Sequence, residues 1–144
     1  MHFDLTEDQQ VFRDNVARFA RSELAPEAAR RARASGYPWE IARRMAELDL
    51  MGIPLPETDG GIGGTLVDAL IALQTVAEAC PRSGDVIQAG NFGPMRTLAE
   101  YGTADQKARY LVPILQGRAV MSQAMTEPQA GSAATEMTTS ATPD

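Results

Sequence analysis

The chain has 144 residues, of which 13 are Lys or Arg and 19 are Asp or Glu, so its net charge is −6. Apolar residues make up 44% and charged residues 22%, which is typical of a folded globular domain and excludes a disordered chain. The acidic balance argues against a nucleic-acid partner, whose affinity rests on Lys and Arg facing phosphates. With one cysteine, Cys80, and one histidine, His2, we expect no disulfide within the chain and no metal site.

The expected location of the protein is the cytoplasm. No stretch approaches the roughly 20 apolar residues of a membrane-spanning helix, so we expect no membrane span. The first four residues also lack the basic region and the apolar run of a secretory signal peptide.

Helix signals begin at residue 6. Residues 6–9 form a capping box, after which apolar residues recur at helical spacing as far as Leu24. Pro26 ends this first helix and opens a short, arginine-rich helix that reaches about Arg33. The arginines of this second helix are expected to form a solvated face.

The next two predicted helices are separated by a loop. The third helix begins at Pro38, and Gly52 is its expected C-terminal cap. Residues 52–64 contain five Gly and two Pro, which predicts a loop. Thr65 then opens a fourth helix, which Pro81 stops. The buried stripe expected on the fourth helix comprises Leu66, Leu70, Leu73, Ala77 and Cys80.

The last helical region is interrupted. Gly90, Gly93 and Pro94 break the helical pattern of residues 84–101, which predicts a bent helix or two short ones. Asn91 lies at this break, either as a capping residue or as a polar group in a pocket. Residues 103–106 form a second capping box, and the helix that it opens is expected to run to about residue 115. The pattern predicts a mainly α domain of five or six helices over residues 1–118.

The composition changes after Arg118. Residues 119–144 contain no Lys or Arg, and seven of the seventeen residues 126–142 are Ser or Thr. Residues 120–126 and 138–142 are predicted to be strands. Because two isolated strands are only marginally stable, we interpret residues 119–144 as the beginning of an incomplete β-domain, with its first one or two strands.

The segment between these predicted strands has the residue types of a binding loop. Ala130, Gly131 and Ser132 have small side chains, which leave backbone N–H groups open to an anion or to the polar edge of a ring. Taken alone, this segment is more simply interpreted as a polar turn between two strands.

The sequence resembles the acyl-CoA dehydrogenase family over its whole length. The most specific motif is Met-Thr-Glu-Pro at residues 125–128 with Ala-Gly-Ser at 130–132, which is similar to the flavin signature of that family. The weaker motifs follow in the family's order at residues 3–9, 51–57, 60–63, 93–94, 101–103, 106–107 and 110–113.

The resemblance implies a three-domain flavoenzyme, of which this chain covers the helical N-terminal domain and the start of the middle β-domain. It implies oxidation of an acyl-CoA thioester to an enoyl-CoA by bound FAD. It also implies an electron-transfer flavoprotein or a similar acceptor as partner, and a homo-oligomer at full length. The catalytic glutamate of the family belongs to the C-terminal bundle, beyond Asp144. We therefore assign no catalytic residue and expect the isolated chain to be inactive.

The resemblance also assigns binding residues by position. Met125 and Thr126 are expected to meet the flavin, and Gly131 and Ser132 its pyrophosphate. Ser132 and Met95 are expected to contact the acyl-CoA.

Two positions depart from the family pattern. Ala133 stands where the family usually has Asp, and Gln129 stands where the residue is often small. Neither Glu127 nor Glu136 is expected to be a general base, because an isolated surface carboxylate has no cause for a raised pKa.

Other functions remain compatible with the same pattern. One is a catalytically inactive helical interaction module of the same ancestry, which requires a genuine stop after Asp144. Another is a relative that acts as an acyl-CoA oxidase or a flavin monooxygenase. The enzymatic alternatives require a downstream β-domain and a helical bundle that carries a base.

Overall fold

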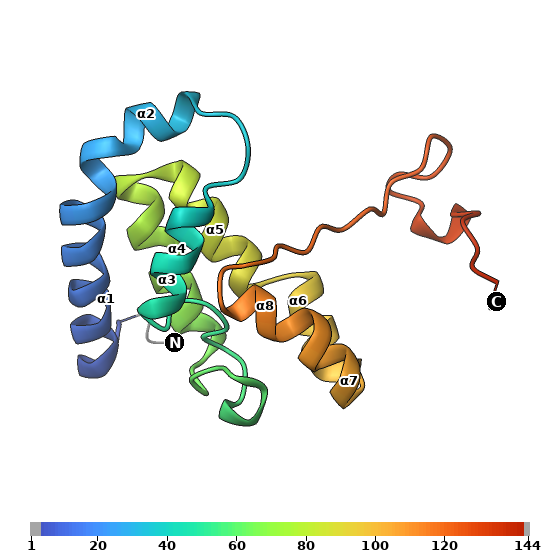
Figure 1. Ribbon diagram of the computed structural model, residues 1–144, viewed down its shortest axis with the longest axis horizontal. Coiled ribbons are helices and arrows are strands. Elements are labelled where there is room, and N and C mark those ends of the chain that lie inside the picture. The colour runs from blue at the N-terminus through green and yellow to red at the C-terminus, as the bar shows by residue number, and fades with distance from the viewer. Residues whose placement is uncertain (1–3, 143–144) are drawn as a thin grey trace.

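The computed structural model describes residues 4–142 and is mainly helical, as predicted (Figure 1). His2, the one histidine, and Phe3, the first residue of the motif at 3–9, lie outside the described residues. The α-helices are α1 (Glu7–Phe19), α2 (Ala28–Arg33), α3 (Trp39–Glu47), α4 (Leu66–Ala79), α5 (Pro81–Asn91), α6 (Pro94–Tyr101), α7 (Ala104–Gln106) and α8 (Val112–Leu115). No helix among residues 4–142 is long and apolar enough to cross a membrane.

Short segments of other helix types continue or link the α-helices. The π-helical segments are η1 (Ala20–Leu24), which extends α1, and η4 (Lys107–Leu111), which joins α7 to α8. The 3₁₀ segments are η2 (Ala25–Glu27), η3 (Glu57–Asp59) and η5 (Ala134–Glu136). The predicted break in residues 84–101 is confirmed, because α5 ends at Asn91 and α6 begins at Pro94.

The main core is built by α1, η1, α3, α4 and α5, and Figure 1 shows α1 standing beside α4. The predicted stripe on α4 is wrong at two positions, because the Leu66 and Leu70 side chains are 43% and 48% exposed. The buried face of α4 instead runs through Ala69, Ala72 and Val76. Small alanines on this face let α4 approach its neighbours closely.

The predicted capping boxes at residues 6–9 and 103–106 are both present. Thr65, predicted to open the fourth helix, forms a further capping box with Asp68, and this box is bonded to the one at residues 6–9. The Gln9 amide oxygen accepts from the Thr6 N–H at 3.1 Å, and its Nε2 donates to Asp68 Oδ1 at 3.0 Å. Asp68 Oδ2 accepts from the Thr65 N–H and hydroxyl, each at 2.7 Å. Burial opposes ionisation of Asp68, but these bonds from Thr65 and Gln9 outweigh it and lower its pKa. The starts of α1 and α4 are therefore held together.

Arg31 corrects the expectation of a fully solvated α2. Its side chain is buried, and Nη1 donates to the Leu24 carbonyl at 2.7 Å. Leu24 is the last residue of η1, where carbonyl groups lack partners within the helix. Arg31 thus satisfies a helix end, while its neighbours Arg30 and Arg33 remain exposed.

A second, smaller core lies under α6 and α8. Its buried residues are Leu55, Met95, Ala99, Leu111 and Ile114. The chain leaves this region through Gly117, whose φ is +64°. A Cβ at position 117 would overlap the backbone carbonyl of Ala42 in α3, so only glycine allows this approach.

The predicted strands at residues 120–126 and 138–142 are wrong for this chain. Among residues 119–142 the one β-type pairing is an isolated bridge between Glu127 and Ala130. Residues 119–126 instead run extended and unpaired, and Figure 1 shows this segment leaving the helices. A strand is stabilised by its neighbours, and the described residues supply none.

Replacing Gly117 with alanine tests the close approach to α3. The Gly117→Ala variant combines left-handed strain with overlap of the Ala42 backbone, so we expect a loss of about 2–5 kcal/mol in the free energy of unfolding. Gly63→Ala is the matched control, because its φ is +66° but its Cβ would meet nothing within 4 Å. That variant should lose about 1–2 kcal/mol. Urea unfolding measures both, and equal losses would contradict the steric explanation.

The link between the two capping boxes is tested at Gln9. The Gln9→Ala variant removes the bonds to Thr6 and Asp68, and we expect it to cost about 1 kcal/mol of stability. Gln88→Ala, on the exposed face of α5, is the control and should change stability by less than about 0.5 kcal/mol. A Gln9 variant as stable as the control would show that the linked boxes do not contribute.

Candidate functional site

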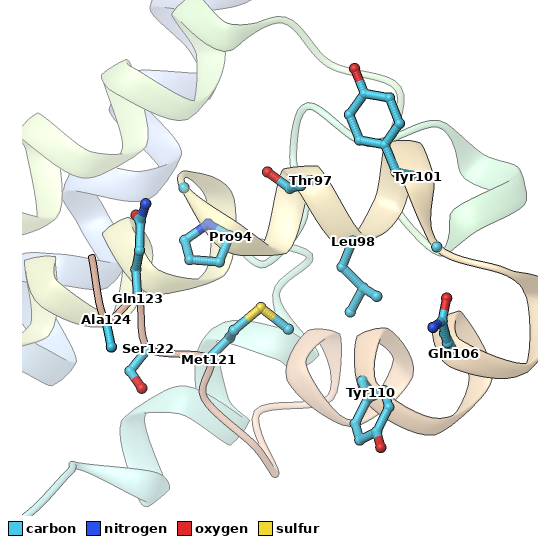
Figure 2. Close-up of a pocket in the computed structure, with 12 residues that line it drawn as sticks. Pro94, Thr97, Leu98, Tyr101, Gln106, Tyr110, Met121, Ser122, Gln123 and Ala124 are labelled. Carbon is cyan, nitrogen blue, oxygen red and sulfur yellow. The ribbon is translucent and has the colours of Figure 1, made fainter. Parts of the chain in front are cut away.

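An open groove of about 760 Å³ lies between α6, the α7–η4 helix and the extended residues 121–124 (Figure 2). A volume of this size falls within the range of small-molecule sites. The groove is lined by Gly93, Pro94, Thr97, Leu98, Tyr101, Gly102, Gln106, Tyr110, Met121, Ser122, Gln123 and Ala124.

The groove has an apolar base and a more polar border. Leu98 and Met121 are half-buried and pack on the second core, and Figure 2 shows both in the space between α6 and the α7–η4 helix. Tyr101 is 75% exposed, and Figure 2 shows it extending away from Leu98. Besides the phenolic hydroxyls of the two lining tyrosines, the hydroxyl and amide groups come from Thr97, Gln106, Ser122 and Gln123. Such a groove suits an apolar chain that carries a polar head.

The start of α6 is set by Gly93 and by the buried Asn91. Gly93 adopts φ +67° and ψ −135°, a conformation that side chains disfavour, and Pro94 then opens the helix. Asn91 Oδ1 accepts from the Ile53 N–H at 2.7 Å. Its Nδ2 donates to the carbonyls of Leu50 and Ile87, at 2.8 and 2.9 Å. Of the two roles left open for Asn91, the structure therefore supports the structural one, because its polar atoms bond the backbone.

Met95, expected from the resemblance to contact the acyl chain, does not line the groove. Its side chain is fully buried in the second core, against which Leu98 and Met121 also pack. Met95 therefore supports the base of the groove from beneath, and its contact with an acyl chain stays a prediction.

The four residues expected to bind the cofactor lie in the exposed tail. Met125 and Thr126 directly follow Ala124, the last residue that lines the groove. Gly131 and Ser132 are exposed, and neither backbone N–H donates a hydrogen bond within residues 4–142. The structure thus brings Met125 and Thr126 to the end of the groove, while Gly131 and Ser132 form a separate loop with open N–H groups.

Glu127 organises this loop and is unsuited to be a base. Its carboxylate accepts from the Thr138 N–H at 2.9 Å and hydroxyl at 3.1 Å, from the Thr139 N–H at 2.9 Å, and from the Gln129 amide. These bonds, led by the one from the Thr138 N–H, lower the pKa of Glu127 to about 2. A carboxylate with so low a pKa is a poor proton acceptor.

An ion pair that the sequence pattern does not predict, between Lys107 and Asp59, holds the glycine-rich loop of residues 52–64 beside the groove. Lys107 Nζ donates to both carboxylate oxygens of Asp59, at 2.8 and 3.0 Å, and the two side chains are largely buried. Lys107 follows the groove residue Gln106, so the pair ties the wall of the groove to residues 52–64. No sequence motif relates Lys107 to Asp59, because the two residues lie 48 positions apart. Among residues 4–142, no cluster of His, Cys, Asp or Glu is suited to a metal ion.

Comparison with known proteins agrees with this architecture. Residues 6–118 match the family model described as acyl-CoA dehydrogenase, N-terminal domain. The probable acyl-CoA dehydrogenase YngJ of Bacillus subtilis is 39% identical over 132 residues, which are 92% of this chain and 35% of that protein. The 3-sulfinopropanoyl-CoA desulfinase of Paraburkholderia xenovorans is 34% identical over 139 residues, which are 96% of this chain and 36% of that protein.

A solved structure shows the same fold. A chain from the structure of the electron-transferring flavoprotein of Acidaminococcus fermentans matches with a TM-score of 0.81 and 33% identity, over 94% of this chain and 36% of that chain. This chain therefore spans about a third of the length of the proteins it matches. Because the family model covers most of its residues, the chain belongs to the acyl-CoA dehydrogenase family and carries its N-terminal domain.

Proposed function

We propose that this chain provides the acyl-binding groove and the first flavin contacts of an FAD-dependent acyl-CoA dehydrogenase. Such an enzyme oxidises the α–β bond of an acyl-CoA thioester to give the enoyl-CoA. The observation that carries the proposal is the continuity between Ala124, which lines the groove, and Met125 and Thr126 of the flavin signature. Residues 1–118 would form the N-terminal domain, and residues 119–144 the start of the β-domain.

The groove supports an acyl thioester as the substrate class. Leu98 and Met121 provide apolar surface for an acyl chain, and burying that chain supplies the binding energy. Thr97, Ser122 and Gln123 provide hydroxyl and amide groups for the polar thioester end. Both relatives named above act on acyl-CoA compounds according to their names, although by different reactions.

The loop of residues 127–139 supports a bound dinucleotide. A pyrophosphate is bound well by backbone N–H groups that have no other partner, and Gly131 and Ser132 offer such groups. A Cβ at Gly131 would meet nothing within 4 Å, so the loop is open on that side. When bound there, FAD supplies the hydride acceptor, and the residues of this chain bind and orient it.

The groove lacks a group that could remove the substrate proton. No Asp or Glu belongs to its lining within the described residues, and Glu127 is held as an ionised carboxylate. Proton removal therefore falls to residues outside this set, and the 144-residue chain alone would be inactive. For the whole protein we propose a homo-oligomer in the cytoplasm, which serves fatty acid metabolism and passes electrons to an electron-transfer flavoprotein or a similar acceptor.

The proposal is tested first on the native polypeptide from the source cells. We expect an intact mass more than twice 15.5 kDa, bound FAD, and reduction of an electron acceptor that depends on acyl-CoA. The purified 144-residue chain, assayed in parallel, should give no turnover. A native mass of 15.5 kDa without flavin would overturn the proposal and would favour the helical interaction module.

The assignment of the groove is tested by filling it. In the native flavin-containing protein, Thr97→Trp should occupy the groove and weaken acyl-CoA binding by about tenfold or more, equivalent to about 1.4 kcal/mol. Arg96→Trp is the control, because Arg96 is the exposed neighbour of Thr97 and is not part of the lining. Calorimetry measures both affinities. Equal affinities would place the acyl chain elsewhere.

A further inference from the structure

We propose that Glu127 is the positioning residue of the flavin-binding loop. The amide of Gln129 reinforces it by bridging the Glu127 carboxylate and the Thr138 hydroxyl. The inference rests on the proposed function, because it assigns the groups that hold Gly131 and Ser132 in place for FAD. Neither residue is assigned contact with the cofactor.

The first step is the tight turn that opens the loop. The Glu127 N–H donates to the Ala130 carbonyl at 3.0 Å, and the Ala130 N–H donates to the Glu127 carbonyl at 3.1 Å. Ala130 is 1% exposed and is the buried residue of an otherwise exposed or half-buried tail over residues 119–142. The turn therefore has a fixed shape, with Pro128 and Gln129 at its tip.

The second step is the closure of the loop by the same residue. The carboxylate of Glu127 holds the backbone N–H groups of Thr138 and Thr139, each at 2.9 Å, eleven and twelve residues along the chain. Glu127 thus bonds Ala130 through its backbone and Thr138 and Thr139 through its side chain. Gly131 and Ser132 lie between these two anchors.

The third step is the part played by Gln129. Its Nε2 donates to the Glu127 carboxylate and also to the Thr138 hydroxyl, the latter at 2.9 Å. The Thr138 hydroxyl in turn donates to the Glu127 carboxylate at 3.1 Å. The side chains of Glu127, Gln129 and Thr138 are therefore each hydrogen-bonded to the other two. Ala133 offers no polar side-chain atom to this loop, and the amide of Gln129 supplies a polar tie in its place.

The consequence concerns Gly131 and Ser132, whose own backbone N–H groups make no bond within residues 4–142. Their position is set by the anchored ends of the loop. Bonds to an ionised carboxylate are stronger than those between neutral groups, so Glu127 suits this task. Preorganising the open N–H groups lowers the entropic cost of binding a pyrophosphate.

The loop itself is tested by NMR on the 144-residue chain. Glu127→Gln should move the backbone amide proton signals of Thr138 and Thr139 upfield, because a neutral amide is a weaker acceptor than a carboxylate. Gln129→Ala and Thr138→Val should shift the same signals by less, and Thr138→Ser, which keeps the hydroxyl, should restore them. Glu136→Gln, in the same loop, is the control and should leave them in place.

The same signals also report the ionisation of Glu127. Its carboxyl pKa is lowered from 4.5 to about 2, so the bonds should persist from neutral pH down to about pH 4 and be lost as the pH falls towards 2. A midpoint near 4.5, or signals that ignore Glu127→Gln, would overturn the loop assignment.

The positioning role is tested by FAD affinity in the native protein. Glu127→Gln and Gln129→Ala should each weaken FAD binding by about tenfold, while thermal unfolding of the apoprotein stays close to that of the Glu136→Gln control. Amide signals that move while FAD affinity stays constant would overturn the positioning role. A native protein without flavin would overturn the proposed function instead, and the amide signals would still report on the loop.

Discussion

The groove depends on the hydrogen bonds of one buried amide, that of Asn91. Its side chain lies at the end of α5 and holds the backbone of Leu50 and Ile53, on the segment that leads into the glycine-rich loop. Without those bonds a buried N–H and a buried carbonyl would lose their partners, which costs more than a bond contributes. The same residue ends α5, so it fixes where the chain turns at Gly93 and where α6 begins. The position of α6, one wall of the groove, is therefore set by the hydrogen bonds that Asn91 makes at the main core.

The parts of the fold that were predictable are those set by local chemistry. Capping boxes satisfy backbone groups within four residues, so the starts of α1, α4 and α7 could be recognised without tertiary information. The buried face of α4 could not, because alanines at 69 and 72 carry no strong hydrophobic signal. Arg31 was missed for a similar reason: the carbonyl that it satisfies belongs to a helix end seven residues earlier. Both the buried face of α4 and the role of Arg31 depend on a contact partner that hydrophobic periodicity does not identify.

In the tail, residues 119–142, the structure at the candidate site likewise depends on partners that local sequence does not identify. Residues 120–126 have strand propensity, yet a ladder needs neighbours, and residues 4–142 provide only the Glu127–Ala130 bridge. The loop keeps its shape because the Glu127 carboxylate accepts hydrogen bonds from the N–H groups of Thr138 and Thr139. The residue types at 125–132 indicated a binding loop. That Glu127 would organise it could not be foreseen, because Thr138 and Thr139, whose N–H groups its carboxylate binds, lie eleven and twelve residues away.

The proposed function separates acyl binding, which the groove would provide, from proton removal, for which the groove offers no carboxylate among the described residues. The groove contributes apolar surface from Leu98 and Met121 and neutral polar groups, and the described residues give it no carboxylate. A scaffold of this kind fixes the class of ligand and leaves the reaction to groups added from elsewhere. The similarity to a dehydrogenase and to a desulfinase, each matched over about a third of its length, fits that division. Under the proposed function, these residues would specify the acyl thioester, and groups outside them would decide the fate of its α–β bond.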